Sequence, residues 1–319
     1  MFWTALPKPF FAMAPMADVT DVAFRALVAK RGKPDVMFTE FVSADGLYHT
    51  LAGEARGTQF FEALRSAALG VTSQNRIPLA SRNPLLRDFA FEENQRPIVA
   101  QIFSSKPEMV AYATKLVAVL GFDGVDLNMG CPDRAIERQG AGAALVKNPS
   151  LAAELIRAAQ EASNLPVSVK TRIGYNKESL DEWLTALLEA NPAAVTLHLR
   201  TRKELSLVKA DWEQMKKAVS IRNRVNPKVL LIGNGDVRDL EDARAKAAES
   251  FCDGVMLGRA MFGNPWVFSA EGGPASGGEG LQEKLAALVE LAHGFEELSP
   301  PKHFAILKKH IKAFVAGFA

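Results

Sequence analysis

The chain has 319 residues, 48% of them hydrophobic and 23% charged, with a formal net charge of +2. It is long enough for a large core, and its charge is too small to indicate nucleic-acid binding by itself. Two cysteines exclude a disulfide framework and predict a reducing, cytoplasmic setting, and because nothing marks a signal peptide or a span of roughly 18 apolar residues, we expect no membrane partner.

Short β-rich runs, each followed by a helical pattern, recur eight times along the chain. Most are near-continuous apolar runs, which are typical of parallel strands covered on both faces. Eight such units in about 260 residues predict a TIM (β/α)8 barrel, which we favour over a doubly wound open sheet because such sheets usually have fewer strands. The predicted strands are Phe10–Ala14, Val36–Glu40, Pro97–Phe103, Gly124–Met129, Pro166–Thr171, Ala193–His198, Val229–Gly233 and Gly254–Gly258.

Amphipathic segments between these strands predict the helices of the barrel. Ser150, Ser179 and Asp239 stand where N-caps are expected. The stretch 44–95 is longer than a β/α unit needs, and we favour a surface insertion with one helix near Gly57–Ala68 over a substrate-facing loop. The predicted barrel helices are Pro107–Leu120, Ser150–Ser163, Ser179–Ala190, Asp211–Val219 and Asp239–Glu249.

The C-terminal part of the chain predicts a small helical domain. We assign residues 1–268 to the barrel, 269–280 to a Gly-rich linker and 281–319 to a domain with helices over Leu281–Glu297 and Lys302–Phe318. Apolar residues of the last segment form one stripe, while its lysines fall mostly off that stripe and no acid follows Glu297. A solvated face and a surface that contacts a phosphate backbone both remain open for these lysines, which are Lys302, Lys308, Lys309 and Lys312.

Polar residues stand where the apolar strands end. In a TIM barrel the catalytic groups lie at the C-terminal ends of the strands, so we expect these side chains to meet at the barrel mouth. Any one of them could serve a structural hydrogen bond, but the whole set is hard to explain in that way. The strand-end residues are Pro15-Met16, Glu40, Gln101, Asn128, Lys170, His198, Asn234-Gly-Asp236 and Gly258-Arg259.

The last two strand ends predict a phosphate site. Gly233-Asn-Gly-Asp236 and Gly258-Arg259 supply close backbone N–H groups and a guanidinium, and loops after strands 7 and 8 are the usual phosphate site of such barrels. Lys170 would either hold negative charge on a ligand, such as that of a reduced flavin, or reach outward to solvent. For His198 a phosphate contact, proton transfer and a structural bond stay open. No cluster has metal-ligand spacing.

Cys131 follows the fourth predicted strand in a Gly-Cys-Pro turn. A thiol in such a turn can act as a nucleophile, as a general acid or as an inert turn residue, and no base beside it in the sequence decides among these roles. Cys252, at the start of the eighth strand, is interpreted as a small buried hydrophobe.

Taken together, these motifs resemble the tRNA-dihydrouridine synthases, which are FMN-dependent enzymes. The resemblance covers about residues 10–268 and extends to the last helical segment. Its motifs occur together and in family order. They are Ala14-Pro-Met16 with Val19-Thr-Asp-Val-Ala-Phe-Arg25, Phe38-Thr-Glu40, Arg96-Pro-Ile-Val-Ala-Gln101, Asp126-Leu-Asn-Met-Gly-Cys-Pro132, Gly140-Ala-Gly-Ala-Ala-Leu145, Val169-Lys-Thr-Arg172, His198-Leu-Arg-Thr201, Gly233-Asn-Gly-Asp236, Gly258-Arg259 and Gly263-Asn-Pro-Trp266.

The resemblance implies that FMN occupies the barrel mouth. Pro15, Met16 and Ala17 would line the flavin ring, while Gln101 and Lys170 would contact its polar edge. The residues implied for the phosphate and ribityl end are His198, Asn234, Gly235, Asp236, Gly258 and Arg259.

The resemblance also implies a reaction, the reduction of uridines in tRNA. Cys131 would protonate C5 of the uracil ring, and Asn128 and Arg172 would contact the substrate. NADPH would reduce the flavin at the same mouth, which agrees with the lack of a dinucleotide-binding fingerprint. We expect a monomer whose last helix and whose Arg134 and Arg138 contact tRNA. The alternatives are another FMN-dependent barrel that reduces a small pyrimidine or an enone, and an RNA-binding protein that has lost catalysis.

Overall fold

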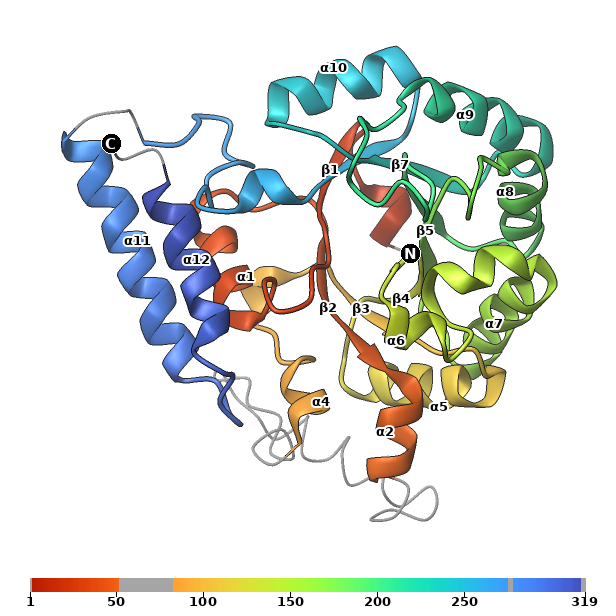
Figure 1. The fold of residues 1–319 in the computed structure, drawn as a ribbon, viewed down its shortest axis with the longest axis horizontal. Coiled ribbons are helices and arrows are strands. Elements are labelled where there is room, and N and C mark those ends of the chain that lie inside the picture. The colour runs from red at the N-terminus through yellow and green to blue at the C-terminus, as the bar shows by residue number, and fades with distance from the viewer. Residues whose placement is uncertain (1, 52–82, 275–277, 317–319) are drawn as a thin grey trace.

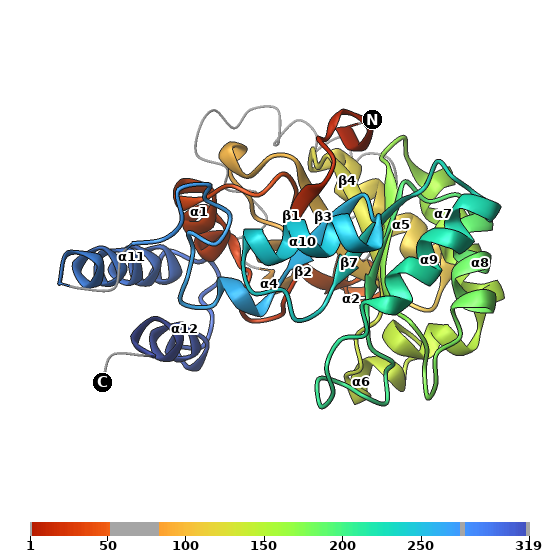
Figure 2. The ribbon, with the colours of Figure 1, turned by 90° about the horizontal axis from the view of Figure 1, so that it is seen from above.

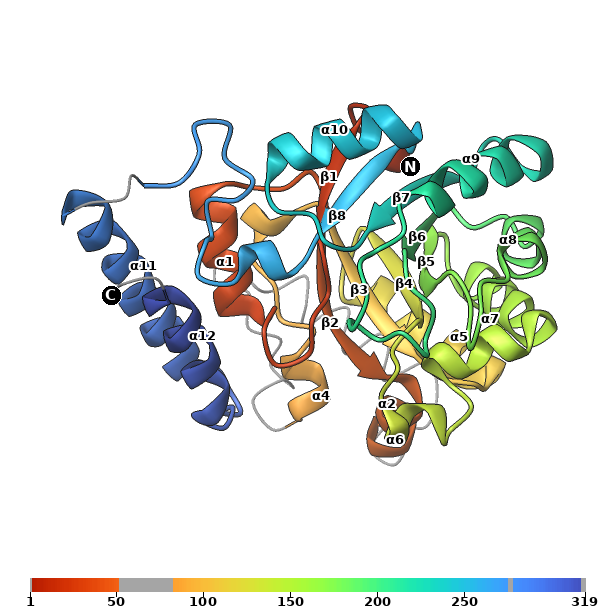
Figure 3. The same cartoon turned by 45° about the horizontal axis from the view of Figure 1, so that its top comes forward.

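The computed structural model describes residues 2–51, 83–274 and 278–316 of the chain. Eight parallel strands form one sheet in the order β1-β8-β7-β6-β5-β4-β3-β2 (Figures 1 and 3). A parallel bridge between Ala12 and Val36, with the Met13 N–H donating to the Val36 carbonyl at 2.9 Å, joins β1 to β2 and closes the ring. The predicted TIM barrel is therefore confirmed. The strands are β1 Phe10–Met13, β2 Met37–Ser43, β3 Ile98–Phe103, β4 Gly124–Met129, β5 Val167–Arg172, β6 Ala194–His198, β7 Leu230–Asn234 and β8 Gly254–Leu257.

Helices cover the outside of the ring (Figure 3). Each helix predicted within the described residues is present, although α9 continues to Val225 instead of ending at Val219. The helix expected near Gly57–Ala68 lies outside the described residues. The helices are α1 Val22–Arg31, α2 Ala44–Leu51, α4 Pro84–Arg87, α5 Pro107–Val119, α6 Arg134–Glu137, α7 Pro149–Ala162, α8 Leu180–Glu189, α9 Glu213–Val225, α10 Leu240–Ser250, α11 Gly278–Glu296 and α12 Ala305–Val315.

One of the three predicted N-caps is confirmed. The Asp239 carboxylate accepts from the Asp242 N–H at the start of α10. Ser179 precedes α8 but its side chain makes no cap hydrogen bond. The Ser150 prediction is wrong: α7 begins one residue earlier, at Pro149, and Asn148 caps it by accepting from the Leu151 N–H. Proline suits the first helical position because its fixed φ is helical and it has no N–H to satisfy there.

The strands are buried because side chains pack against both of their faces. All six residues of β4 are buried, as a parallel strand between a helical layer and a filled barrel requires. At the N-terminal end of the strands, Trp3 packs beside Phe10 with ring centroids 5.9 Å apart and helps to fill the barrel. The opposite end, where the strands terminate, is therefore left for the polar residues. None of the described helices is long and apolar enough to cross a membrane.

The two C-terminal helices lie against one side of the barrel, away from α7, α8 and α9 (Figure 2). Helix α11 packs beside α1, where Glu290 pairs with Lys30 at 2.6 Å and with Arg31 at 2.8 Å. The apolar stripe predicted for the last segment is only partly covered. Leu307 and Phe314 of α12 are buried, whereas the exposed fractions of Phe304 and Val315 are 55% and 41%.

Lys302 fits neither interpretation left open for the lysines of the last segment, a solvated face or a surface that contacts a phosphate backbone. Its side chain is only 3% exposed and forms an ion pair with the Glu40 carboxylate, itself 4% exposed, and lies 3.5 Å from Asp88. Glu40 also differs from its predicted place, because β2 continues past it to Ser43. Its other oxygen accepts from the Asp18 N–H at 2.5 Å, in the turn that follows β1. One buried ion pair therefore ties the C-terminal segment to the barrel.

We expect Lys302→Met to destabilise the protein by about 3–5 kcal/mol, because it leaves the Glu40 carboxylate buried without its cation. Burial raises the pKa of Glu40 from 4.5 to about 7. The folded chain thus binds a proton there that the unfolded chain lacks, and this contribution to stability is lost as the pH rises through that window. At pH 5 the Glu40 carboxyl is protonated and needs no cation, so Lys302→Met should lower the free energy of urea unfolding more at pH 8 than at pH 5.

The matched control is Lys312→Met, which removes an exposed lysine of α12 and should change the unfolding free energy by less than about 0.5 kcal/mol. Equal effects of the two substitutions would show that the Lys302–Glu40 pair does not hold the segment in place.

Candidate active site

The register of the sheet brings five of the predicted site residues into two rows at the C-terminal ends of the strands. Asn128 of β4 is the partner of Lys170 of β5. Arg172, His198 and Asn234 are partners in turn across β5, β6 and β7. Since alternate residues of a strand face the same side, these two rows present their polar side chains on the same face of the sheet, where the apolar runs end.

Lys170 has few partners for a charged side chain. Its Nζ lies 3.4 Å from Asn234 Oδ1, and it forms no ion pair with any described residue. Burial, with the nearby Arg172 charge, lowers the pKa of Lys170 to about 8. A cation held in this way is poorly solvated, and an anionic ligand would relieve the cost. The alternative of a lysine that reaches outward to solvent does not agree with this environment.

His198, Arg200, Asp236 and Arg259 form a second cluster. Arg200 Nη1 lies 3.0 Å from His198 Nε2, and because a guanidinium only donates, Nε2 accepts and Nδ1 carries the proton. Burial and the surrounding cations lower the pKa of His198 to about 2, so the imidazole is neutral. Such a ring is a fixed hydrogen-bonding group and does not supply a proton as imidazolium.

The Asp236 carboxylate is the anionic centre of this cluster. It accepts from Arg200 Nη2 and from Arg259 Nη2, each at 2.5 Å, and from the Ala210 N–H at 2.8 Å. Despite its partial burial, these hydrogen bonds hold the pKa of Asp236 below its usual value. The Asp236 carboxylate therefore holds the two arginines in place, and both of its oxygens already accept hydrogen bonds from protein groups.

The loop after β7 needs its glycines. Gly235 has φ of 127°, a conformation that side chains rarely adopt, and a Cβ there would lie 2.8 Å from Ala210 Cβ. A Cβ on Gly233 would lie 2.5 Å from the ring of Trp212, whose Nε1–H donates to the Gly235 carbonyl at 2.9 Å. The Trp212 side chain thus packs against this loop and fixes its backbone. This fixed backbone is suited to close approach of a ligand.

The turn after β1 completes the rim of the site. Met16 is half-buried and Ala17 is exposed. The Met16 N–H donates to Thr20 Oγ1 at 2.9 Å, and the Met16 carbonyl accepts from the Thr20 N–H at 3.0 Å. Gly258, after β8, lies beside this turn, since a Cβ on it would come within 3.8 Å of Met16 Sδ.

Cys131 lies just past β4 and is half-buried. Its N–H donates to Asn128 Oδ1 at 2.9 Å, and its carbonyl accepts from the Ala143 N–H at 2.9 Å. The chain returns so closely at Gly142, where φ is 59°, that a Cβ would lie 2.7 Å from the Cys131 carbonyl oxygen. Burial raises the pKa of the Cys131 thiol above its usual value of 9.0, so the sulfur keeps its proton at neutral pH. A protonated thiol is suited to a general acid and not to a nucleophile.

Arg172 braces this turn. Its Nε donates to the Gly130 carbonyl at 2.9 Å, and its Nη1 donates to the carbonyls of Thr201 and Leu205 at 3.0 and 3.1 Å. The side chain is 7% exposed. Most of its donors are therefore committed to the protein backbone, although its charge still lies close to Cys131.

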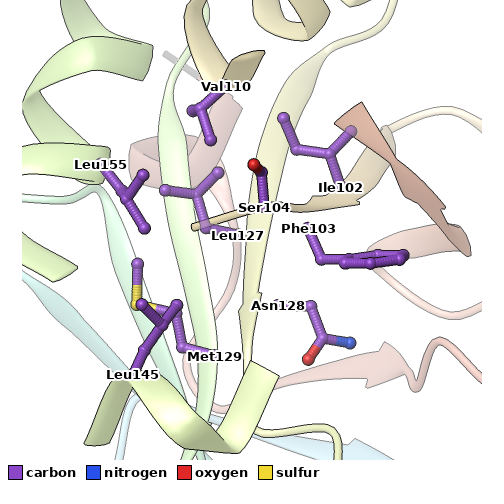
Figure 4. Close-up of a pocket in the computed structure, with 9 residues that line it drawn as sticks. All are labelled: Ile102, Phe103, Ser104, Val110, Leu127, Asn128, Met129, Leu145 and Leu155. Atoms are coloured by element: carbon purple, nitrogen blue, oxygen red, sulfur yellow. The ribbon is translucent and has the colours of Figure 1, made fainter. Parts of the chain in front are cut away.

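A small pocket lies on the opposite side of β4 from the mouth. Its empty volume of about 170 Å³ includes open solvent and leaves no room for a water-sized molecule, so it is too small for a flavin. In Figure 4 the Asn128 side chain points away from Leu145 and Leu155. The lining residues are Ile102, Phe103, Ser104, Val110, Leu127, Asn128, Met129, Leu145 and Leu155.

Comparison with known proteins decides which family carries this site. The family model described as "Dihydrouridine synthase (Dus)" matches residues 12–81 and 71–318. A "Probable tRNA-dihydrouridine synthase" of Staphylococcus aureus (strain COL) is 36% identical over 317 residues, 99% of this chain and 87% of that protein. A "Probable tRNA-dihydrouridine synthase 2" of Bacillus subtilis (strain 168) is 38% identical over 320 residues, 99% of this chain and 88% of that protein.

The chain belongs to the dihydrouridine synthase family. The family resemblance predicted from its motifs is thereby confirmed, and the chain is an oxidoreductase. Solved structures of morphinone reductase share the fold at low identity. One has a TM-score of 0.52 at 14% identity and covers 84% of this chain and 86% of that one. A second, in complex with tetrahydroNAD, has a TM-score of 0.50 at 13% identity, with 84% and 87% covered.

Several residues that shape the site of this dihydrouridine synthase were missed by the sequence analysis. Arg200 is 2% exposed and joins His198 to Asp236, yet it was only quoted within a motif. Trp212 was not singled out. Asp126 was interpreted as part of a strand, although a carboxylate in an otherwise apolar run was a usable signal. In each case the partner lies on another strand or loop.

Proposed function

We propose that this dihydrouridine synthase reduces uridines in tRNA to 5,6-dihydrouridine, with FMN as the hydride carrier, NADPH as the reductant and Cys131 as the general acid. The observation that carries the proposal is a protonated thiol and a lysine without an ion-pair partner at the same strand ends. The Cys131 thiol keeps its proton, and Lys170 lies on the strand next to the one that leads into the cysteine turn. A reduction that adds hydride and proton needs both an acid and a cation for the developing charge.

The residues at the mouth fit FMN. Lys170 is a half-buried cation without an ion pair among the described residues, which suits an anionic flavin edge. Gly235 and Gly258 give the backbone of the last two loops close access to a phosphate, and Arg259 is 67% exposed beside them. When bound and reduced, FMN supplies the hydride that C6 of uracil receives.

The remaining roles at the cofactor site follow from the contacts described above. Asp236 holds Arg200 and Arg259 in place, so it serves the phosphate indirectly, and the neutral His198 is a hydrogen-bonding group at the same end. Pro15, Met16 and Ala17 line the ring from the β1 turn, and Asn234 stands at the end of β7. Gln101, which was predicted at a strand end and at the flavin edge, lies within β3, because that strand continues to Phe103, and it has no exposed surface. We propose the same site, in turn, for NADPH.

Cys131 then donates its proton to C5 of the uracil ring. Burial raises the pKa of the Cys131 thiol, so the thiol stays protonated between turnovers. Arg172 lies close enough to favour the thiolate left behind, and it fixes the turn through the Gly130 carbonyl. Asn128 holds the Cys131 N–H and is placed to contact the base.

The tRNA must deliver a base that has left its stack, because the thiol lies at the barrel mouth. Arg134 and Arg138 are exposed on and just after α6, close in sequence to Cys131. Lys308 and Lys309 are exposed on α12, and Lys309 lies 3.7 Å from Asp18 in the turn after β1. We propose that these two surfaces hold the RNA backbone on either side of the mouth, with Lys302 excluded because it is buried.

The test is flavin absorbance followed by substrate selection. The purified chain, reconstituted with FMN, should be yellow and should consume NADPH when it is given tRNA that lacks dihydrouridine. Free uracil, uridine or a small enone should give little consumption. A colourless protein after reconstitution would contradict FMN as the cofactor. Faster turnover of the small molecules than of tRNA would contradict tRNA as the substrate.

A further inference from the structure

Asp126, a buried carboxylate beneath the site, has no role in the function proposed above. We propose that it is a positioning residue that fixes the backbone turn of Cys131 through the side chains of Gln101 and Asn128. The effect on proton transfer rests on the proposed function, whereas the effect on the turn does not.

The carboxylate lies in a polar layer inside the barrel. Gln101, Asp126 and Ser168 are register partners across β3, β4 and β5. Asp126 and Gln101 have no exposed surface, and Ser168 is 2% exposed. Because side chains alternate along a strand, this layer lies directly below the pair of Asn128 and Lys170.

The hydrogen bonds of this layer run in one direction. Asp126 Oδ1 accepts from Ser168 Oγ at 2.6 Å, and Asp126 Oδ2 accepts from Gln101 Nε2 at 2.7 Å. Gln101 Oε1 therefore faces the other way and accepts from Asn128 Nδ2 at 3.0 Å.

The Asn128 amide connects this series of hydrogen bonds to the turn that holds Cys131. Since its Nδ2 is turned to Gln101, its Oδ1 accepts from the N–H groups of Cys131 and Gly130, at 2.9 and 3.2 Å. An amide turned the other way would present its N–H2 group to those two donors. An oxygen acceptor at position 126 thus sets which end of each amide faces the next group, up to the cysteine.

The test measures how fast iodoacetamide alkylates Cys131 in the full chain, by peptide mass spectrometry, with flavin content determined by absorbance. Asp126→Leu removes the acceptor for Gln101, so the turn loses its fixed Asn128 oxygen and opens more often. Loss of a hydrogen bond of ordinary strength in this equilibrium gives alkylation about five to ten times faster than in the wild type. Cys252, which is 7% exposed, is the internal reference in each sample.

Two variants of the same layer separate this role from general packing. Ser168→Ala removes a hydrogen bond to Asp126 but leaves Gln101 its acceptor, so Cys131 should be alkylated within twofold of the wild-type rate. Asp126→Asn keeps an oxygen for Gln101, turns its amide N–H2 group to Ser168 Oγ, and should restore that rate.

Wild-type alkylation in Asp126→Leu overturns the proposal, as does equal acceleration in Ser168→Ala. If Asp126→Leu does not fold, Gln101→Met takes its place in the test, because it removes the next member of the same series of hydrogen bonds. A folded Gln101→Met with an unchanged alkylation rate would also overturn it. None of these readouts needs turnover, so a chain that does not reduce uridine would still report on the turn.

Discussion

Cys131→Ala should lower the rate of dihydrouridine formation by about a hundredfold to ten-thousandfold and leave FMN bound. The range is that of a lost general acid, since hydride addition at C6 leaves charge that only a slow proton from water can then discharge. The side chain of Cys131 makes no described contact that builds the cofactor site, so flavin absorbance should be unchanged. The measurement is nucleoside mass spectrometry of tRNA digested after a timed reaction.

The matched control is Cys252→Ala, which removes the only other thiol of the chain. Cys252 is buried, two residues before β8, and its Sγ lies 3.1 Å from the Gly254 carbonyl. It should keep its turnover even if its stability falls slightly. A Cys131→Ala protein that forms dihydrouridine at the wild-type rate would remove the thiol from the mechanism.

Lys170→Met should weaken FMN binding by about tenfold to a hundredfold, as expected for the loss of one hydrogen bond between charged groups. The same substitution removes a poorly solvated cation, so it should not lower the melting temperature of the flavin-free protein. Lys115→Met, at an exposed position of α5, is the control and should bind FMN as the wild type does. Both affinities can be measured by quenching of flavin fluorescence.

The pH dependence of binding provides a further check on Lys170. Because burial lowers the pKa of Lys170 to about 8, the side chain is charged below that pH and loses its charge as the pH rises through it. FMN affinity of the wild type should therefore fall as the pH rises above about 8, and this fall should be absent in Lys170→Met. The same fall in both proteins would assign the titration to another group.

Local patterns in the sequence were sufficient to predict the framework. Each strand is an apolar run of its own, so the eight strands could be found one at a time, and the known geometry of the barrel then placed their ends together. Cys131 and Lys170 were found in this way, because one follows a strand directly and the other interrupts an apolar run. The predicted ends of α7 and α9 were wrong by one to six residues, because capping and packing determine where a helix begins and ends.

What could not be predicted depends on contacts between residues far apart in the chain. Lys302 and Glu40 are separated by 262 positions, and nothing near either one in the sequence indicates a buried ion pair. The two arginines on Asp236 likewise come from different loops, and nothing near Asp236 in the sequence indicates that its oxygens accept hydrogen bonds from both. The orientation of the Gln101 and Asn128 amides between Asp126 and Cys131 could not be predicted either. It depends on the strand register and on which side-chain atoms donate and which accept hydrogen bonds.

The most direct test of the account is to map dihydrouridine in tRNA from cells that lack this chain. The account predicts that specific dihydrouridines are missing, that the wild-type chain restores them, and that Cys131→Ala, expressed to the same level with its flavin bound, does not. Unchanged dihydrouridine in the deficient cells, or full restoration by Cys131→Ala, would contradict it.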